Sequence, residues 1–302
     1  MEIAVTGASG LIGTALCHDL RAAGHRVRPL VRRASTDADA IAWDPAAGTI
    51  DAAALEGVDA VVHLAGAGIG DKRWNDAYKR EVLESRTRST DLLARTLASL
   101  DRKPSVLVSG SAIGFYGATG DEAVDESAPA GRDFLADVCV AWEAAAAPAS
   151  EAGIRVALLR TGIVLSPAGG ALAKLLPLFR LGLGGRMGSG RQWMSWISLD
   201  DEVRVIRWLL DHDVRGPVDA VAPTPVTNRE LTTTLARVLH RPALFPVPSF
   251  GPKLLLGSEL AEALLFTSAR VRPGVLEAHG FEFGDPELEG ALRRLLARPA
   301  AA

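Results

Sequence analysis

A strand, a glycine-rich turn and a helix open the chain, and they constrain its fold more than any other feature. Residues 2–6 are a short apolar and β-branched run, residues 7–13 have the spacing G-x-x-G-x-x-G, and an amphipathic stretch runs from Leu11 to Ala23. Such glycines serve a tight turn, the approach of backbone to a pyrophosphate, and helix–strand packing. An ordinary strand-to-helix turn is the alternative. The predicted dinucleotide-binding residues here are Gly7, Ser9, Gly10, Leu11, Ile12 and Gly13.

Two arginines end the second predicted strand. This strand runs from Arg26 to Val31, and Arg32 and Arg33 follow it, about twenty residues past the last glycine. An acidic residue at this place accepts the ribose hydroxyls of NAD, whereas a cationic pair suits the 2′-phosphate of NADP. The sequence therefore predicts NADP(H) as the cofactor, with two solvated surface arginines as the alternative.

Strands and helices then alternate up to Val164. The predicted strands are Ala40–Asp44, Ala60–Gly66, Val106–Ser109 and Ile154–Leu159, and the predicted helices are Asp76–Ser85, Arg86–Leu100 and Phe134–Ala149. This alternation predicts an α/β fold with a doubly wound parallel sheet of the Rossmann type. Small residues at a strand end let backbone pass close to a cofactor. The predicted contacts of this kind are Leu64, Ala65, Gly66 and Ser109.

The chain changes character after Val164. Residues 166–195 are rich in glycine, and Thr227 and Glu230 form a capping box that predicts a helix of about a dozen residues. We expect a Rossmann domain of residues 1–165, to which residues 196–222 return. Residues 166–195 and 223–302 are expected to form a smaller mixed α/β substrate domain over the carboxyl ends of the strands.

A basic and aromatic group of residues lies in and just after the glycine-rich segment. Arginine and tryptophan are side chains that anchor anionic or planar groups. A structural aromatic cluster joining the two parts of the fold is the alternative. The predicted substrate residues are Lys174, Arg186, Arg191, Gln192, Trp193 and Trp196.

Composition excludes several classes of protein. The net charge is −3, from 33 basic and 36 acidic residues without a long basic block, so no nucleic-acid partner is expected. The six histidines have no metal-ligand spacing, so no metal is predicted, and Cys17 and Cys139 are expected to be buried free thiols. No apolar run reaches the length of about 18 residues that a membrane span needs, and no signal peptide is expected because the first predicted strand begins at the second residue. We expect a cytoplasmic monomer or homodimer with a small-molecule substrate and no membrane partner.

Several longer motifs resemble the extended and atypical short-chain dehydrogenase/reductase superfamily. TGASGLIG at residues 6–13, HLAG at 63–66 and SGSAIGFYG at 109–117 fit its template. LLRTGIVLSPAGGAL at 158–172 and RQWMSWISLDD at 191–201 resemble one branch, the NADP-binding "epimerase family" proteins of bacteria and mitochondria, which are NAD-dependent epimerase/dehydratase-like with their own C-terminal domain. The resemblance covers nearly the whole chain.

The resemblance also implies where the chemistry lies. In the superfamily a serine and a Tyr-x-x-x-Lys pair exchange a proton with the substrate while hydride moves to or from the nicotinamide. Ser111 matches the serine, but Leu135 and Cys139 stand at the places of the tyrosine and lysine. Tyr116 follows the serine loop and is the second catalytic candidate, although the superfamily commonly uses that position for binding.

Three more polar residues are predicted to face the cofactor. Arg86 stands close to where the superfamily usually has an asparagine, and Glu81 is expected to pair with it near the nicotinamide ribose or the pyrophosphate. A chance spacing of surface charges is the alternative. Arg160 ends the sixth predicted strand, where a buried arginine needs an anion or a carboxylate. Lys72, on the loop over the site, is a weaker candidate for proton transfer.

The sequence therefore leaves two principal hypotheses for function. The first is an NADP(H)-binding atypical short-chain dehydrogenase/reductase, an oxidoreductase or epimerase acting on an unidentified small or nucleotide-linked substrate. The second is a non-catalytic NADP(H)-binding sensor or scaffold, which the absence of the Tyr/Lys pair favours. A nucleotide-sugar epimerase with ordinary chemistry is the third, and the same absence argues against it.

Overall fold

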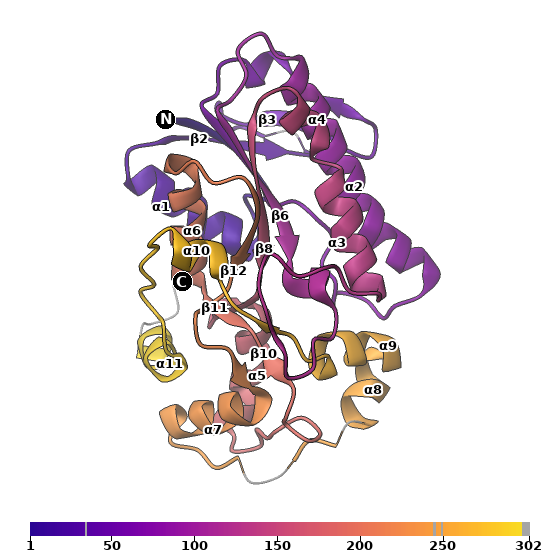
Figure 1. Ribbon diagram of the computed structural model, residues 1–302, viewed down its shortest axis with the longest axis vertical. Coiled ribbons are helices and arrows are strands. Elements are labelled where there is room, and N and C mark those ends of the chain that lie inside the picture. Colours follow the sequence, from indigo (N-terminus) through magenta and orange to yellow (C-terminus); the bar gives the residue numbers. More distant parts are fainter. Residues whose placement is uncertain (34, 244–245, 249, 298–302) are drawn as a thin grey trace.

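A twisted sheet of eight strands forms the centre of the molecule, in the order β12-β8-β6-β5-β1-β2-β3-β4 (Figure 1). The computed structural model describes residues 1–33, 35–243, 246–248 and 250–297. All neighbouring strands are parallel except β3 and β4. The strands are β1 (Glu2–Thr6), β2 (Arg26–Val31), β3 (Ile41–Asp44), β4 (Thr49–Ile50), β5 (Ala60–His63), β6 (Val106–Ala112), β8 (Arg155–Thr161) and β12 (Gly216–Ala220). The predicted doubly wound parallel sheet is confirmed.

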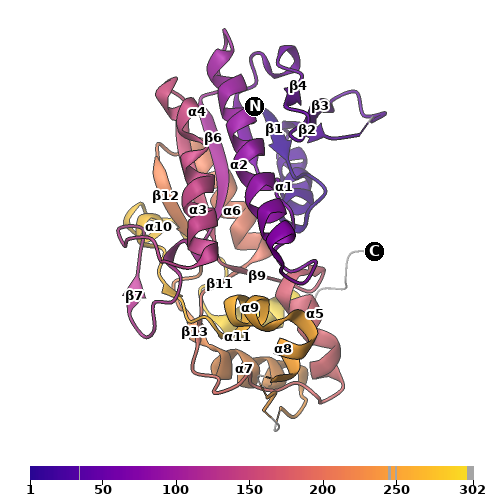
Figure 2. The same cartoon turned by 90° about the vertical axis from the view of Figure 1, so that its right-hand side faces the viewer.

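Helices cover both faces of this sheet. Side chains alternate along each strand, so Ile3 and Val5 pack toward one set of helices and Ala4 toward the other. The first set is α1 (Leu11–Ala22), α6 (Leu199–Asp211) and α10 (Gly274–Ala278). The second set is α2 (Asp76–Ser99), α3 (Phe134–Ala144) and α4 (Ala147–Glu151), with α2 beside both α3 and α4 (Figures 1 and 2).

Two helical predictions were wrong. Residues 76–99 form one helix of 24 residues instead of two, because no glycine or proline interrupts the chain near Arg86. The predicted helix 134–149 is divided after Ala144, and the next helix begins with Pro148 in its first turn. Proline has no backbone N–H for the preceding turn, so it suits a new helix start.

The remaining elements form a smaller unit at the carboxyl end of the sheet (Figure 2). Its core joins α5, α7 and α11, and α7 begins with the predicted capping box of Thr227 and Glu230. The helices are α5 (Gly170–Arg180), α7 (Asn228–Leu239), α8 (Phe250–Leu256), α9 (Ser258–Ala261) and α11 (Leu288–Ala297), with short helical turns at η2 (Ile113–Tyr116) and η3 (Glu262–Phe266). A further turn, η1 (Ala53–Leu55), lies before β5 and packs in the core of the main sheet. The strand pairs are β7 (Ala123–Val124) with β14 (Arg270–Val271), β9 (Ile163–Ser166) with β11 (Trp196–Ser198), and β10 (Trp193–Met194) with β13 (Val226–Thr227).

The end of the chain returns to the main sheet. Leu276, in α10, and Phe281 lie in the core between the sheet and α1. Asp201, at the start of α6, accepts the backbone N–H groups of Gly284 and Asp285 at 2.9 and 2.8 Å. Residues 274–285 therefore tie the smaller unit to the sheet. Among the described helices, none is both long and apolar enough to cross a membrane.

Candidate functional site

The turn between β1 and α1 holds three glycines with two different tasks. Gly7 has a positive φ of 67°, and a Cβ there would lie 2.8 Å from the carbonyl carbon of Leu64. A Cβ on Gly13 would lie 2.1 Å from the Gly7 carbonyl oxygen, so both positions need glycine for backbone packing. Gly10 caps α1 without a side-chain hydrogen bond and is exposed together with Ser9. The amide end of α1 is therefore open to an anion.

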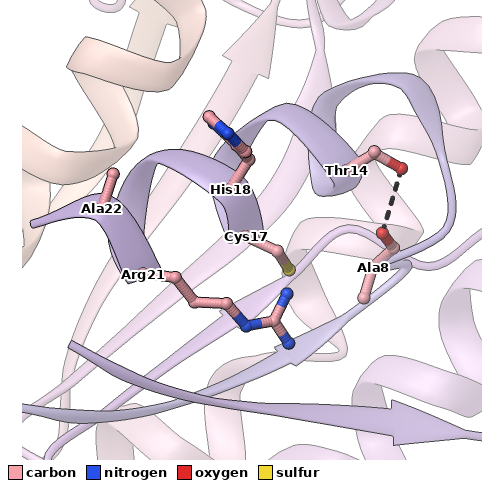
Figure 3. Close-up of a pocket in the computed structure, with 6 residues that line it drawn as sticks. All are labelled: Ala8, Thr14, Cys17, His18, Arg21 and Ala22. Carbon is pink, nitrogen blue, oxygen red and sulfur yellow. Dashed lines mark hydrogen bonds between the residues drawn. The ribbon is translucent and has the colours of Figure 1, made fainter. Parts of the chain in front are cut away.

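An open cavity of about 500 Å³ runs along the flank of α1 beside this turn. Its lining residues are Ala8, Thr14, Cys17, His18, Arg21 and Ala22 (Figure 3). Thr14 donates a hydrogen bond to the Ala8 carbonyl at 3.2 Å, and Figure 3 shows the Arg21 guanidinium pointing along the helix toward Ala8. The cavity extends toward the far end of α1, away from the carboxyl ends of the central strands. We therefore do not assign it to the substrate.

Buried side chains tie the end of β1 to the end of β5. The Thr6 hydroxyl oxygen accepts the N–H groups of Leu64 and Ala65, at 3.0 and 3.1 Å. The Thr6 hydroxyl donates its own hydrogen bond to His63 Nδ1, 2.7 Å away. The imidazole proton is then on Nε2, which donates to the Thr90 hydroxyl at 2.9 Å. Burial lowers the pKa of His63 to about 4, so the imidazole is neutral. These bonds fix the predicted small-residue turn after β5 beside the glycine turn.

The arginines predicted to select NADP follow the carboxyl end of β2, at the same edge of the sheet as the glycine turn. Arg32 and Arg33 are both exposed, and neither forms an ion pair with any residue that the structure describes. Two unpaired cations at the end of β2 remain available to a phosphate group.

The predicted pair of Glu81 and Arg86 does not form. Glu81 is exposed and pairs with Lys72 at 3.1 Å. Side chains three or four residues apart share a helix face, but a spacing of five puts them on different faces. The same pairing occupies the Lys72 ammonium in an exposed position, which argues against proton transfer by Lys72.

Arg86 is a buried cation without a carboxylate partner. It is 7% exposed, and within the described chain its side chain makes one hydrogen bond, from Nη1 to the Val82 carbonyl at 3.0 Å. The guanidinium lies 5.0 Å from the centre of the Trp142 ring and 3.3 Å from the place of a Cβ on Gly66. Burial lowers the pKa of Arg86. Because a buried charge is costly unless it is paired, this position fits an anion that the chain does not supply.

Two further buried polar atoms at this edge have no hydrogen-bond partner among the described residues. They are Ser109 Oγ in β6 and Nε1 of Trp142 in α3. The ring of Trp142 is the one that faces Arg86. Since unpaired buried polar groups cost free energy, these atoms fit a bound polar group, as the sequence predicts for Ser109.

The places of the superfamily's tyrosine and lysine lie on α3, beside the end of β6. Leu135 packs against Gly114, and Cys139 Sγ lies 3.6 Å from the Ala112 carbonyl oxygen. Burial raises the pKa of the Cys139 thiol to about 12, so it carries no charge at neutral pH. The site therefore has neither the hydroxyl nor the ammonium group at these two places.

Both predicted catalytic side chains belong to one buried network. Ser111 donates to Glu143 Oε1 at 2.7 Å. Arg160 binds the same carboxylate twice, through Nε at 2.8 Å and Nη2 at 2.9 Å, and donates from Nη1 to the Tyr116 hydroxyl at 2.9 Å. Tyr116 in turn donates to Asp219 at 2.7 Å. The network therefore crosses the carboxyl ends of β6, β8 and β12.

This network argues against two predictions. Tyr116 is 4% exposed, and its hydroxyl is directed into the protein toward Asp219, which argues against a catalytic role. Burial and the Asp219 carboxylate raise the pKa of Tyr116. Arg160 is also 4% exposed, and Glu143 and Tyr116 occupy its three nitrogen atoms. The anion that Arg160 needs is therefore Glu143 and not the cofactor.

Sequence reasoning missed the carboxylates of the network. Glu143, Asp219 and Glu126 are not among the residues predicted for the site. Glu126 accepts the N–H groups of Asp219 at 2.9 Å and Val275 at 3.1 Å, from segments 93 and 149 residues away. Burial, with the nearby Glu126 carboxylate, raises the pKa of Asp219 to about 8. No local spacing could have indicated such distant partners.

Two of the predicted substrate residues are structural. Trp196 is 1% exposed and donates to the Thr224 carbonyl at 3.0 Å, so the prediction for it was wrong. Side chains alternate between the two faces of the short strand β11, and this places the indole of Trp196 in the core of the smaller unit. Gln192 is buried and donates from Nε2 to the Leu265 carbonyl at 2.9 Å, which holds its loop in place.

The other predicted substrate residues keep accessible surface. Trp193 is half-buried, donates to Asp121 at 2.9 Å, and has the Arg270 guanidinium 4.3 Å from its ring centre. Three cations of this group form no ion pair within the described chain: Lys174, Arg186 and Arg191. The described residues contain no cluster of three or more side chains placed to hold a metal.

Residues 3–221 match the NAD dependent epimerase/dehydratase family. The chain belongs to this family. Residues 247–295 match a domain of unknown function, DUF1731. The two matches divide the chain into the sheet-forming part and the part that contains α8, α9 and α11.

Similar proteins support the predicted branch of this family. Epimerase family protein Mb2239 of Mycobacterium bovis is 45% identical over 298 residues, 98% of each chain. Human epimerase family protein SDR39U1 is 35% identical over 301 residues, 98% of this chain and 100% of the human one. The crystal structure of human SDR39U1 (isoform 2) with NADPH has a TM-score of 0.91 at 34% identity and covers 99% of this chain and 100% of that chain. The predicted atypical branch is thereby confirmed.

Proposed function

We propose that this family member binds NADP(H) and is an atypical short-chain dehydrogenase/reductase that acts on an unidentified small or nucleotide-linked substrate. The observation that carries the proposal is the glycine turn, in which Gly10 caps α1 without a side chain and leaves the amide end of the helix open. The human relative, whose structure was determined with NADPH, supports the choice of cofactor.

Several residues of this chain fit the parts of the cofactor. Arg32 and Arg33 are unpaired and suit the 2′-phosphate, and the open amides of α1 suit the pyrophosphate. Arg86 offers a buried cation to the pyrophosphate or the nicotinamide ribose. When bound, NADP(H) gives or accepts a hydride. A side chain of the protein then has to exchange a proton with the substrate. Of the superfamily's three catalytic side chains, this chain keeps only the serine, Ser111.

One observation favours the alternative of a non-catalytic NADP(H)-binding sensor or scaffold. The hydroxyl proton of Ser111 is donated to Glu143, the Tyr116 hydroxyl is directed inward, and the thiol of Cys139 is neutral. A general acid typically contributes about 10² to 10⁴ in rate. Steady NADPH oxidation with aldehydes, ketones or UDP-sugars, lost in Ser111→Ala, would favour the enzyme over the sensor.

Cofactor preference tests the proposal directly. NADPH is expected to bind at least about tenfold more tightly than NADH, about 1.4 kcal/mol, because two cations face the 2′-phosphate. Arg32→Ala combined with Arg33→Ala should remove the preference, whereas Arg88→Ala, an exposed arginine of α2, should keep it. Isothermal titration calorimetry with both cofactors measures this. Equal affinities of the unmutated protein for the two cofactors would contradict the proposal.

A further inference from the structure

One part of the smaller unit differs in charge from the rest of the chain. Residues 166–195 and 223–256 contain eight lysines and arginines and a single glutamate, a net charge of +7 in a chain of net charge −3. These cations are spaced singly along the sequence, so no basic block is visible in it. Whether these cations form one charged surface depends on how the fold places them.

The fold gathers these segments at one end of the molecule. Figures 1 and 2 both show α5, α7 and α8 at the end farthest from β3 and α4. Arg241, after α7, donates from Nε to the carbonyl of Arg180, the last residue of α5. Val247 is bonded to the backbone of Arg186 and Gly188, at 2.8 and 3.1 Å. We call this region, formed by residues 170–188 and 228–256 as far as they are described, the basic end.

Large apolar side chains are exposed at the basic end. Five of the eight exposed large apolar residues of the described chain lie there: Leu178 (48% exposed), Leu181 (72%), Leu183 (67%), Phe250 (72%) and Leu254 (76%). Spacings of three and four residues put side chains on one helix face. Leu178 and Leu181 therefore share a face at the end of α5, and Phe250 and Leu254 share one on α8.

Cations flank these apolar side chains. Lys253, between Phe250 and Leu254 on α8, pairs with Glu262 at 2.8 Å, whereas the cations beside the leucines of α5 have no acidic partner among the described residues. Lys174 lies one turn before Leu178, and it is exposed like Arg180 and Arg241. None of the three cations forms an ion pair with a residue that the structure describes. Exposed leucines with free cations beside them are the pattern of a surface that lies on a bilayer, with apolar side chains in the headgroup region and cations against anionic lipids.

We propose that the basic end binds the surface of a bilayer containing anionic lipids. The absence of a spanning helix among the described residues is compatible with this, because a surface-bound protein inserts side chains and not a segment. Nucleic acid would explain the cations but not five exposed apolar side chains. A second copy would cover the apolar side chains but would bring two surfaces of net positive charge together. The proposal does not depend on the cofactor or on turnover.

Flotation of the full-length protein with lipid vesicles tests the proposal. Vesicles of phosphatidylcholine with about 30% phosphatidylglycerol should retain the protein in low salt and release most of it at about 0.5 M salt, because salt screens surface charges. Vesicles of phosphatidylcholine alone should retain at least about tenfold less.

Two double variants separate the charged from the apolar contribution. Lys174→Glu with Arg180→Glu should weaken binding about tenfold or more, and Leu181→Ser with Leu183→Ser should weaken it severalfold. All four side chains are exposed, so both variants should keep the thermal stability of the wild type. The controls carry the same changes elsewhere: Arg132→Glu with Arg215→Glu, and Val140→Ser, which is 44% exposed on α3.

The outcomes divide clearly. Loss of vesicle binding in both double variants, with binding kept in the controls, supports the proposal. No binding to the anionic vesicles, or equal binding to phosphatidylcholine alone, overturns it. Loss in the glutamate variant but not in the serine variant would indicate a general anion-binding surface and would overturn a bilayer as the partner. Self-association that the serine variant abolishes, without vesicle binding, would indicate a second copy instead.

Discussion

Arg86 and Arg160 are both buried arginines at the carboxyl edge of the same sheet, but they differ in their hydrogen-bond and ion-pair partners. Arg160 makes two hydrogen bonds to Glu143 and one to Tyr116. Arg86 makes one bond, to the carbonyl of Val82, and has no carboxylate partner within the described chain. The fold neutralises the guanidinium of Arg160, whereas that of Arg86 has no anion beside it among the described residues.

This difference predicts a structural role for Arg160 and a ligand-binding role for Arg86. A buried cation that is paired contributes to the folded state, and removing it leaves an unpaired buried carboxylate. A buried cation that is unpaired costs free energy until a ligand supplies the anion. The two arginines should therefore respond differently when each is replaced.

Replacing Arg160 should have the largest effect, and it should be on stability. Arg160→Met leaves Glu143 buried without its cation and removes a donor from Tyr116. The free energy of unfolding should fall by about 3–5 kcal/mol, measured by denaturant titration. A double variant, Arg160→Met with Glu143→Leu, should recover much of this loss because no buried charge is then left unpaired. An Arg160→Met protein as stable as the wild type would show that the network is not structural.

Replacing Arg86 should act on binding instead. Arg86→Gln removes a charge-assisted contact, so NADPH affinity should fall about ten- to hundredfold. Without NADPH, stability should stay the same or rise, since an unpaired buried charge has been removed. Calorimetry for binding and denaturant titration for stability measure both quantities.

Arg88→Gln provides the matched control for Arg86. It lies on the same helix but is exposed and pairs with Glu84, so its replacement should change neither quantity appreciably. If Arg86→Gln destabilised the protein without NADPH and left NADPH affinity intact, the contrast with Arg160 would fail.

The sequence was sufficient for features that depend on neighbouring residues. The strand Arg26–Val31, the glycine turn and the capping box of Thr227 are local patterns, and the structure has all three. The sequence was not sufficient to predict in which direction a side chain at the end of a strand points. Ser111 and Arg160 stand opposite each other in neighbouring strands, and both reach a carboxylate on α3 that no local spacing connects to them.

The same limit explains the wrong predictions in the site. Tyr116 follows the serine loop closely enough to be a plausible proton donor, but its partner Asp219 is 103 residues away and turns it inward. Trp196 belongs to an arginine- and tryptophan-rich run, but the alternation of a short strand places its indole in the core. Only tertiary structure shows which polar groups are already satisfied.

Two buried glutamates extend the comparison from cations to anions. Glu143 is held by Arg160, whereas Glu202 is 0% exposed and has no cation beside it among the described residues. Thr161 donates to Glu202 Oε1 at 2.7 Å, and Oε2 has no partner among the described residues. Burial raises the pKa of Glu202 from 4.5 to about 8. The carboxyl group therefore keeps its proton in the folded protein at neutral pH.

This difference predicts a dependence of stability on pH. Since the folded pKa of Glu202 is about 8 and the unfolded one about 4.5, the folded state binds more protons between these values. Its contribution to stability is full below the lower value and is lost as pH rises toward the upper one. Glu202→Gln cannot ionise, so the free energy of unfolding of the wild type relative to this variant should fall by about 1 kcal/mol from pH 6 to pH 7.

Comparing the two proteins isolates this contribution from that of His63. The folded pKa of His63 is lowered to about 4, so its contribution to stability is lost as pH falls below about 6.5 and has the opposite sign. His63 is present in both proteins, and its contribution therefore cancels in the difference. Denaturant titrations from pH 5 to pH 8, with Glu122→Gln as an exposed control, measure that difference. A value that does not change with pH would mean that Glu202 is ionised in the folded protein, held like Glu143 by a partner.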